Sequence, residues 1–244
     1  MMKPKIAIIG AGLAGLYCCK LLLKNGYEVE VFEKSNRIGG RMKTDILDGY
    51  LLDHGFHVLQ TGYPFSSKVI DYDSLEVKPF QPGAMVIKSS PSRSKIWRLS
   101  DPFRSPFKAI RDSLGFFASP LDMLRVLRMR HKIRKIPHND IFEEGNLSTE
   151  EWLRGQNFSQ RFIDRFFYPL FSGIFLESEL RTDERMFKFV FRSMSDGDMV
   201  IPKNGIQAVP ELIAKEIPKE VINLDSNVEL NSNQSISIDG EIKN

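Results

Sequence analysis

Three glycines near the N-terminus, Gly10, Gly12 and Gly15, have the G-x-G-x-x-G spacing of a loop that binds a dinucleotide. The first glycine permits a tight turn, the second lets the backbone approach a pyrophosphate, and the third allows a helix to pack closely on a strand. Glu33 lies 23 residues beyond Gly10, where its carboxylate could accept hydrogen bonds from ribose hydroxyl groups. A helix that begins at this loop would direct free N–H groups and its dipole at the phosphates. The pattern therefore predicts a dinucleotide site, and a glycine turn that binds nothing is the alternative.

The type of dinucleotide is narrowed by Glu33 and by the residues that follow it. A carboxylate at this position would repel a 2′-phosphate, which disfavours NADP and leaves FAD and NAD. Beyond it, Arg37 and Arg41 flank the pair Gly39 and Gly40. Arginine suits paired hydrogen bonds to phosphate oxygens, and two glycines let the backbone pass close to a bulky ligand. Two arginines on a surface turn would be the purely structural interpretation.

Strands and a helix must position these residues. The apolar run at 5–9 predicts a buried parallel strand that ends at the first glycine. Residues 16–25 have apolar side chains at helical spacing, and Gly26 is typical of a C-terminal cap. Residues 27–33 then predict a second strand. Strand, glycine turn, helix and strand together make a βαβ unit, and the expected fold class is α/β and Rossmann-like.

The rest of the chain predicts an insertion into this unit. Prolines and serines from 89 to 106 mark a connection, and residues 107–194 are predicted to be mostly helical, with helix starts at Ser119 and Ser148. We therefore expect a cofactor domain made of residues 1–85 and 198–244. A mainly helical substrate region, residues 86–197, is inserted between its two parts.

Three longer segments carry a resemblance to a known family. GAGLAGLYCC, EVFEKSNRIGGRM and GYLLDHGFHVLQTGYP are similar to the start of the FAD-dependent amine oxidase and phytoene desaturase-like superfamily. The resemblance implies FAD as the cofactor, bound in part by a D-x-G element at 53–55 that leads toward the flavin ring. Residues 201–210 resemble a P-x-G-G segment of the family, with Asn204 in place of the first glycine. The residues that the resemblance and the fingerprint place on FAD are Gly10, Gly12, Gly15, Glu33, Arg37, Gly39, Gly40, Arg41, Gly55, Phe56, His57 and Val228.

The same resemblance implies a reaction class, which is oxidation or desaturation of a small apolar substrate, such as an isoprenoid, by hydride transfer to the flavin. A flavin amine oxidase of the same superfamily is one alternative, and an inert fragment that at most binds a dinucleotide is another. An NAD dehydrogenase is disfavoured by the R-x-G-G-R loop. We name no catalytic residue, because flavin chemistry needs no protein base and a lone histidine such as His57 is more often structural. No metal site is expected, because His54, His131 and His138 lack ligand-like spacing.

The C-terminal residues predict an unfinished hairpin. An alternating strand at 235–239 reaches an Asp239-Gly240 turn, after which only a few residues remain. We therefore expect this strand to lack a partner on the returning side. The chain is expected to be the N-terminal portion of a longer protein, because members of the resembled family contribute a later segment to the flavin site.

Composition excludes several classes of protein. The chain has 244 residues, of which 42% are hydrophobic and 27% charged, and this is ordinary globular composition. No apolar run is as long as a membrane span, and no signal peptide is evident. The adjacent cysteines Cys18 and Cys19 cannot form a disulfide scaffold or a zinc module. A reducing, cytoplasmic location is expected.

Positive charge is concentrated in one segment. Residues 93–135 contain twelve Lys or Arg and three Asp, whereas the remainder of the chain is mildly acidic. Within this segment, residues 121–136 combine leucines with many cations and could contact an anionic membrane as a peripheral surface, although a solvated helix face is the simpler interpretation. Nucleic-acid binding is not expected, because no recognised module accompanies the charge. Nine phenylalanines could line an apolar tunnel or form an ordinary core: Phe103, Phe107, Phe116, Phe117, Phe162, Phe166, Phe167, Phe171 and Phe175.

Overall fold

The structure is a computed structural model that describes residues 5–88, 94–101, 119–143, 145–230 and 236–243. The chain forms two compact units, each of which is discontinuous in sequence. The first unit contains 1–59, 65–79 and 200–244, and the second contains 60–64 and 80–199. These divisions lie close to the boundaries expected after residues 85 and 197. Within the described residues, no helix combines the length and hydrophobicity that a membrane span requires.

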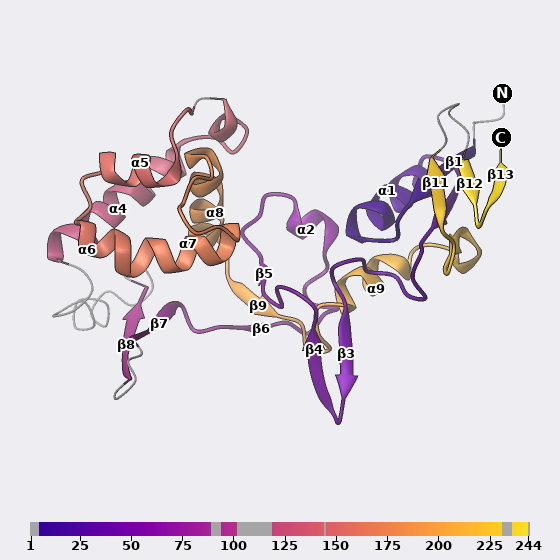
Figure 1. The fold of residues 1–244 in the computed structure, drawn as a ribbon, viewed down its shortest axis with the longest axis horizontal. Coiled ribbons are helices and arrows are strands. Elements are labelled where there is room, and N and C mark those ends of the chain that lie inside the picture. The colour runs from indigo at the N-terminus through magenta and orange to yellow at the C-terminus, as the bar shows by residue number, and fades with distance from the viewer. Residues whose placement is uncertain (1–4, 89–93, 102–118, 144, 231–235, 244) are drawn as a thin grey trace. The chain divides into compact units, whose positions relative to one another are not determined.

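The first unit contains a three-stranded parallel sheet, and Figure 1 labels its first strand beside the first helix. Strand β1 (Lys5–Ile9), helix α1 (Leu13–Lys24) and strand β2 (Glu28–Phe32) make the predicted βαβ unit. Strand β10 (Ile222–Asn223) pairs with the other edge of β2, so the order is β1-β2-β10. Gly26 has a φ of +73° just beyond α1, as expected for a helix cap. The two ends of the chain therefore build one sheet.

Strand β1 differs from its prediction in burial. It pairs in parallel with β2, with Ile8 opposite Val31, and Ile8 packs into the core of the unit. The side chain of Ile9, however, is 51% exposed, and Lys5 and Ala7 on the same face are exposed too. Successive side chains of a strand face opposite sides of a sheet, and no described element covers this side of β1. The prediction of a fully buried strand is therefore wrong, although the parallel pairing is confirmed.

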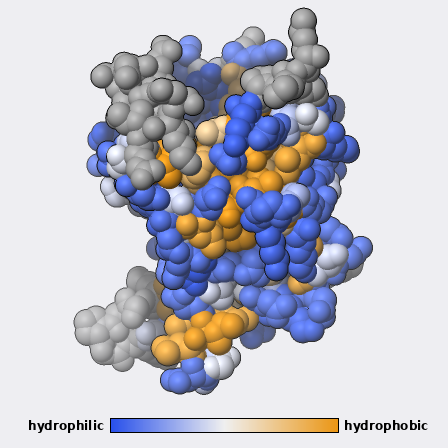
Figure 2. Space-filling model, turned by 90° about the vertical axis from the view of Figure 1, so that its right-hand side faces the viewer, coloured by the Kyte–Doolittle hydropathy of each residue, from blue (hydrophilic) through white to orange (hydrophobic). Residues whose placement is uncertain are grey.

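The remaining elements of the first unit are short. Strands β3 (Thr44–Leu47) and β4 (Tyr50–Asp53) form the hairpin that the Asp48-Gly49 pair predicts, and both turn residues have positive φ. The hydrophobic side chains of this hairpin are exposed, and they colour part of the surface in Figure 2. Further short elements are α2 (Ser66–Val69), β6 (Lys78–Pro79), α9 (Ala208–Ala214) and a 3-10 turn at Lys219–Val221. Two strands lie at the junctions between the units, β5 (Leu59–Gln60) and β9 (Met199–Ile201).

The C-terminal strands correct one prediction. Strands β11 (Val228–Leu230), β12 (Ile236–Ile238) and β13 (Glu241–Lys243) form an antiparallel sheet in that order. β12 lies between its two neighbours, with Ser237 opposite both Glu229 and Ile242. The expectation that this strand lacks a partner is therefore wrong, because three residues after the Asp239-Gly240 turn are enough to pair along its whole length.

The second unit is mainly helical, as predicted for the described part of residues 107–194. Its helices are α4 (Pro120–Lys135), α5 (Thr149–Gly155), α6 (Gln160–Phe162), a π-helical segment (Ile163–Phe167), α7 (Tyr168–Phe175) and α8 (Glu184–Asp196). A 3-10 turn (Asp140–Phe142) and the hairpin of β7 (Gly83–Lys88) and β8 (Lys95–Ser100) complete it. Ser119 and Ser148 each accept a hydrogen bond from the backbone three residues later, so both predicted helix starts are confirmed.

Aromatic rings fill the centre of these helices. Phe162, Phe167, Phe171 and Phe187 are fully buried, and the ring of Phe167 contacts those of the other three at centroid distances between 5.1 and 6.3 Å. Phe166 and Phe175 pack against the same cluster from positions that are partly buried. These side chains therefore form a packed core rather than the wall of a tunnel. Phe103, Phe107, Phe116 and Phe117 lie outside the described residues.

Candidate cofactor site

The fingerprint glycines lie where their small size is required. Gly10 has a φ of +99°, and its N–H donates to the carbonyl oxygen of Phe32 at 2.7 Å, which fixes the loop to the end of β2. A Cβ on Gly15 would lie 2.0 Å from the carbonyl oxygen of Gly10. The tight turn and the close approach of helix to strand that the sequence predicts are therefore both present.

A second glycine loop lies against the first. The N–H of Gly39 donates to the carbonyl oxygen of Ala11 at 2.9 Å, and Gly39 forms a parallel bridge with Gly12. A Cβ on Gly40 would lie 3.3 Å from the Cα of Gly12. The two loops thus meet backbone to backbone with no side chain between them. A ligand resting on this pair of glycines would contact the main chain directly.

Positive potential surrounds this bare backbone. Gly12 is the N-terminal cap residue of α1, the helix has no side-chain cap, and its first turn contains no acidic residue. The first N–H groups of a helix have no partner within it and attract anions. The side chain of Arg41 is exposed, and it makes no hydrogen bond or ion pair with any described residue. The arrangement can therefore hold a phosphate group between α1 and Arg41.

The Glu33 carboxylate holds the two loops in place. It is 7% exposed, and it accepts hydrogen bonds from the N–H of Ala11 at 2.8 Å and from the N–H and hydroxyl group of Ser35 at 3.0 and 2.6 Å. Burial raises the pKa of Glu33, but these hydrogen bonds outweigh it, so the pKa lies below its usual value. A carboxylate offers about four acceptor positions, so about one remains for the predicted ribose hydroxyl.

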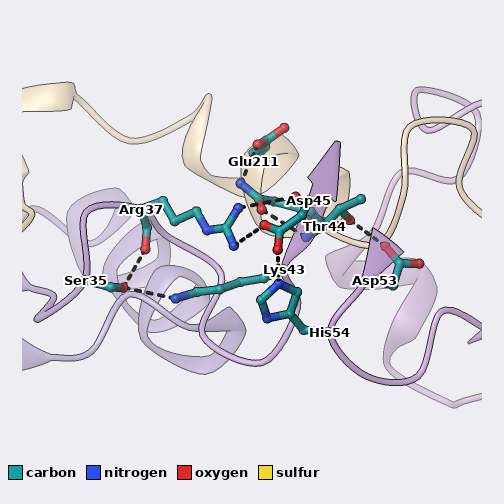
Figure 3. Close-up of polar contacts among 9 residues, drawn as sticks. Ser35, Arg37, Lys43, Thr44, Asp45, Asp53, His54 and Glu211 are labelled. Carbon is teal, nitrogen blue, oxygen red and sulfur yellow. Dashed lines mark hydrogen bonds and ion pairs between the residues drawn. The ribbon is translucent and has the colours of Figure 1, made fainter. Parts of the chain in front are cut away.

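The side chain of Arg37 binds to the base of the β3–β4 hairpin. Figure 3 shows its guanidinium group at Asp45, where Nη2 donates to Oδ1 at 2.6 Å, and Nη1 donates to the carbonyl oxygen of Thr44 at 3.3 Å. His54 Nε2 lies 2.6 Å from the other carboxylate oxygen of Asp45. The hydrogen bonds from His54 and Arg37 lower the pKa of Asp45. The structure therefore separates the roles of the two predicted arginines, because only Arg41 has an uncommitted charge.

A hydrogen-bonded lock attaches the hairpin to the loop before α9. Asp53 Oδ1 accepts from the hydroxyl group of Thr44 at 2.6 Å (Figure 3). The same oxygen accepts from the N–H of Ile206 at 3.0 Å, and Thr44 in turn accepts from the N–H of Gln207. Gly205 has a φ of +82° and a Cβ there would lie 2.5 Å from Thr44. Asn204 does not have a positive φ, which explains why this position does not need the glycine of the P-x-G-G pattern.

The other predicted residues lie around this framework. A Cβ on Gly55 would be 3.8 Å from the carbonyl oxygen of Arg41, so the segment at 54–57 passes close to the second glycine loop. Phe56 and His57 are exposed. Val228 is half-buried at the start of β11, and the preceding Ser226 donates its N–H to the carbonyl oxygen of Glu33 at 2.9 Å.

Sequence reasoning missed several residues of the framework. Asp45 binds the predicted residue Arg37, Ser35 binds Glu33, and the carbonyl oxygen of Thr44 accepts from Arg37. Gln207 in turn positions Thr44. Thr44 and Asp45 lie outside the motifs that we used, and Ser35 and Gln207 lie within two of them at positions to which the sequence assigned no role. Their partners are up to 163 residues away, as between Thr44 and Gln207. The only available signal was the position of Thr44 and Asp45 directly after the R-x-G-G-R loop. Among the described residues, no group of three His, Cys, Asp or Glu could hold a metal ion.

Comparison with known proteins places this geometry in a family. Residues 13–230 match the sequence profile described as flavin containing amine oxidoreductase. The chain belongs to this family. Over 51 residues it is 49% identical to 4,4'-diapolycopen-4-al dehydrogenase from Metabacillus indicus and 47% identical to 4,4'-diapophytoene desaturase from Staphylococcus aureus (strain Newman). Each of these alignments covers 21% of this chain and 10% of the relative. The predicted family resemblance is confirmed.

The fold of the family is found over almost the whole chain. Cyclohexylamine oxidase from Brevibacterium oxydans superposes with a TM-score of 0.67 at 16% sequence identity, over 97% of this chain and 54% of that structure. At this level of identity, the likeness concerns the fold alone. The chain thus spans about half the length of that structure. The predicted α/β fold class, a Rossmann-like cofactor domain with a helical insertion, is confirmed.

Proposed function

We propose that this flavin oxidoreductase family member binds FAD on its paired glycine loops and serves the oxidation or desaturation of an apolar, isoprenoid-like substrate. The observation that carries the proposal is the contact between Gly12 and Gly40, which leaves bare backbone beside the uncapped N-terminus of α1 and the free Arg41. A nicotinamide dinucleotide would use the first loop but would have no need of the second.

Each residue has a defined task in this proposal. Gly12 and Gly40 let the diphosphate approach the main chain, while the first N–H groups of α1 and the guanidinium of Arg41 neutralise its charge. Glu33 keeps the two loops in register through Ala11 and Ser35, and its remaining acceptor position would accept a hydrogen bond from a ribose hydroxyl group. Arg37 orients the hairpin through Asp45 and does not contact phosphate. When bound, the flavin supplies the acceptor for a hydride.

Two substrate classes are supported by different observations. The relatives that share 47–49% identity over 51 residues are named for a carotenoid-type desaturation and an aldehyde dehydrogenation, which favours a long apolar substrate. The family description, flavin containing amine oxidoreductase, favours an amine as the second candidate. Among the described residues, the buried phenylalanines form a packed core, so they do not favour either class.

The test begins with the cofactor. The purified chain is incubated with FAD or with NAD, and bound cofactor is measured by absorbance after gel filtration. Binding of FAD in preference to NAD is expected, and weak FAD binding is consistent with a flavin site to which a later segment of the family contributes. Arg41→Ala should weaken FAD binding by about 1.5–3 kcal/mol, the scale of a charge-assisted hydrogen bond. Arg37→Ala is the matched control, because it removes the same charge from a side chain that is already paired, and it should affect hairpin stability more than FAD affinity.

The outcomes separate the alternatives. Selective retention of NAD would contradict the cofactor, and equal FAD affinity in wild type and Arg41→Ala would contradict the assigned role of Arg41. For the loaded protein, anaerobic bleaching of the flavin absorption by an apolar polyene rather than by a primary amine would support desaturation. Bleaching by the amine alone would support the second candidate. Retention of FAD with no bleaching by either class would assign cofactor binding alone.

A further inference from the structure

Helix α4 has one buried face and one face that no described element covers. Asp122, Val126, Met129 and Ile133 are buried, and they recur at helical spacing. On the other side, Leu121, Leu124 and Leu127 are 60%, 51% and 39% exposed. Residues three apart are neighbours on a helix surface, so these leucines form a short apolar stripe. The buried face accounts for the packing of the helix, but it does not account for the stripe.

Uncommitted positive charge continues this exposed face toward the C-terminus of the helix. Arg128 and Lys135 follow Leu124 by one and three helical turns, and Lys132 lies beside them. All three are exposed, and none has a hydrogen bond or ion pair with a described residue. The acidic residue of the helix, Asp122, is buried and already paired. No acidic side chain of α4 therefore compensates these cations.

Beside these cations the surface is hollowed. An open hollow of about 510 Å³ is lined by Leu127, Arg130, His131, Arg134 and Lys135. Two of its arginines are fixed in place, because Arg130 donates to the carbonyl oxygen of Ser195 at 2.7 Å and Arg134 pairs with Asp196 at 2.8 Å. The hollow thus combines an apolar edge with a cationic wall, which is the chemistry that a phosphate headgroup attached to acyl chains requires.

We propose that the exposed face of α4 is a docking surface for an anionic phospholipid bilayer. Arg128, Lys132 and Lys135 lie over lipid phosphates, and Leu121 and Leu124 enter the boundary between headgroups and acyl chains. This is a peripheral contact in the plane of the membrane surface, and it depends on both charge and apolar area.

The apolar stripe favours a bilayer over nucleic acid as the partner. Basic residues attract either polyanion, and the charge alone does not distinguish them. Burying the exposed leucines between the cations, however, is favourable only where apolar chains replace water around them. A nucleic-acid backbone offers no apolar chains. Charge and stripe together therefore match a lipid surface.

The direct experiment is co-sedimentation of the full 244-residue chain with two kinds of vesicle, pure phosphatidylcholine and an equimolar mixture of phosphatidylcholine and phosphatidylglycerol. We expect binding to the mixed vesicles, weaker binding at high salt, and little binding to the neutral ones. The readout requires neither bound flavin nor catalytic activity, so it is independent of the function proposed above.

Two variants separate charge from apolar contact. The triple variant Arg128→Glu, Lys132→Glu, Lys135→Glu should lower partition onto mixed vesicles by roughly a hundredfold or more, since each basic residue near the surface contributes about 1 kcal/mol. The double variant Leu121→Asn, Leu124→Asn keeps every charge and should lower partition several-fold. The control reverses three exposed lysines of the first unit, Lys24→Glu, Lys215→Glu, Lys219→Glu, which changes net charge equally and should bind more tightly than the α4 triple variant.

Several results would overturn the proposal. Equal loss of binding in the control and the α4 triple variant would show a nonspecific charge effect, and unchanged binding of the leucine variant would remove the apolar contact. If the wild-type chain does not bind mixed vesicles but does bind DNA of random sequence, the partner of these cations is nucleic acid. Far-ultraviolet circular dichroism of each variant identifies any loss of fold. If the α4 triple variant does not fold, the single substitution Lys135→Glu replaces it.

Discussion

The two units use their most distinctive residues in opposite ways. In the first unit, glycines without side chains let two loops meet at Gly12 and Gly40. Beside them, Arg41 is exposed and has no partner among the described residues. In the second unit, phenylalanine rings fill the interior, and the ring of Phe167 contacts several other buried phenylalanine rings. The paired glycine loops leave space and charge unused, whereas the aromatic core of the second unit leaves neither.

The contrast explains why the same kind of sequence reasoning was specific in one unit and ambiguous in the other. Several glycines at fixed spacing around one tight turn are rarely needed for packing alone, so the glycine spacing predicted a ligand site. A phenylalanine suits a tunnel and a core equally well, and only packing distinguishes them. The following predictions test whether the two units differ in the way that these contacts indicate.

The largest effect is expected in the aromatic core. Phe167→Ala removes a fully buried ring that contacts Phe162, Phe171 and Phe187, and it should lower the free energy of unfolding of the second unit by about 3–5 kcal/mol. Urea unfolding followed by Trp152 fluorescence in a Trp97→Phe background measures it. Phe80→Ala is the control, because its ring is 45% exposed and its loss should cost under about 1 kcal/mol. Equal costs would contradict the packed core.

A smaller effect concerns acid stability of the same unit. Burial raises the pKa of Asp122, but hydrogen bonds from Ser159 and Ser119 outweigh it and lower the pKa from 3.8 to about 2. A depressed folded pKa stabilises the protein above the unfolded value, and this contribution, about 2 kcal/mol, is lost as the pH falls from about 4 through about 2. Asp122→Asn should remove the contribution at neutral pH and flatten this part of the pH dependence.

Urea unfolding across this range measures the acid effect. The exposed Asp140→Asn provides the control and should leave the curve unchanged. A wild-type slope that persists in Asp122→Asn would show that other carboxylates carry the acid sensitivity of this unit.

Among these substitutions, Gly12→Ala is expected to have the smallest effect on stability and the greatest effect on FAD binding. Gly12 has a φ of −75°, and a Cβ there would lie 3.9 Å from the Cα of Gly40, which is ordinary contact. Gly12→Ala should therefore cost no more than about 1 kcal/mol of the free energy of unfolding, since alanine caps a helix N-terminus less well than glycine, while the added methyl group occupies the backbone surface proposed for FAD. Paired measurements of urea unfolding and FAD retention test this separation. A large loss of stability, or full retention of FAD, would show that the two loops are not a ligand surface.

Local chemistry was predictable from the sequence, and long-range contacts were not. The βαβ unit, the Asp48-Gly49 hairpin and the capping boxes follow from residues within a few positions of one another. The pairing of β12 and the exposed face of β1 depend on which strands become neighbours, and no local pattern contains that information. For the same reason the sequence assigned both Arg37 and Arg41 to the cofactor, whereas in the structure Asp45 pairs with Arg37.

Helix boundaries show the same limit. Helix α9 spans only Ala208–Ala214, although the apolar spacing from 205 to 219 suits one longer helix. It begins no earlier because Gly205 has a positive φ and packs against Thr44 and Asp53. In α4 the basic residues alternate with Leu121, Leu124, Leu127 and Met129. Only Met129 belongs to the buried face, which Val126 and Ile133 complete.

The pairing of β2 with β10 has a consequence for the order of events during protein synthesis. Val31 and Asn223, which meet at this edge, are 192 residues apart. At a translation speed of about 5–20 residues per second, the first strands wait roughly 10–40 seconds for their third partner. The helices of the second unit leave the ribosome entirely within that interval. Nascent β1 and β2 therefore remain a candidate client for a chaperone until β10 emerges.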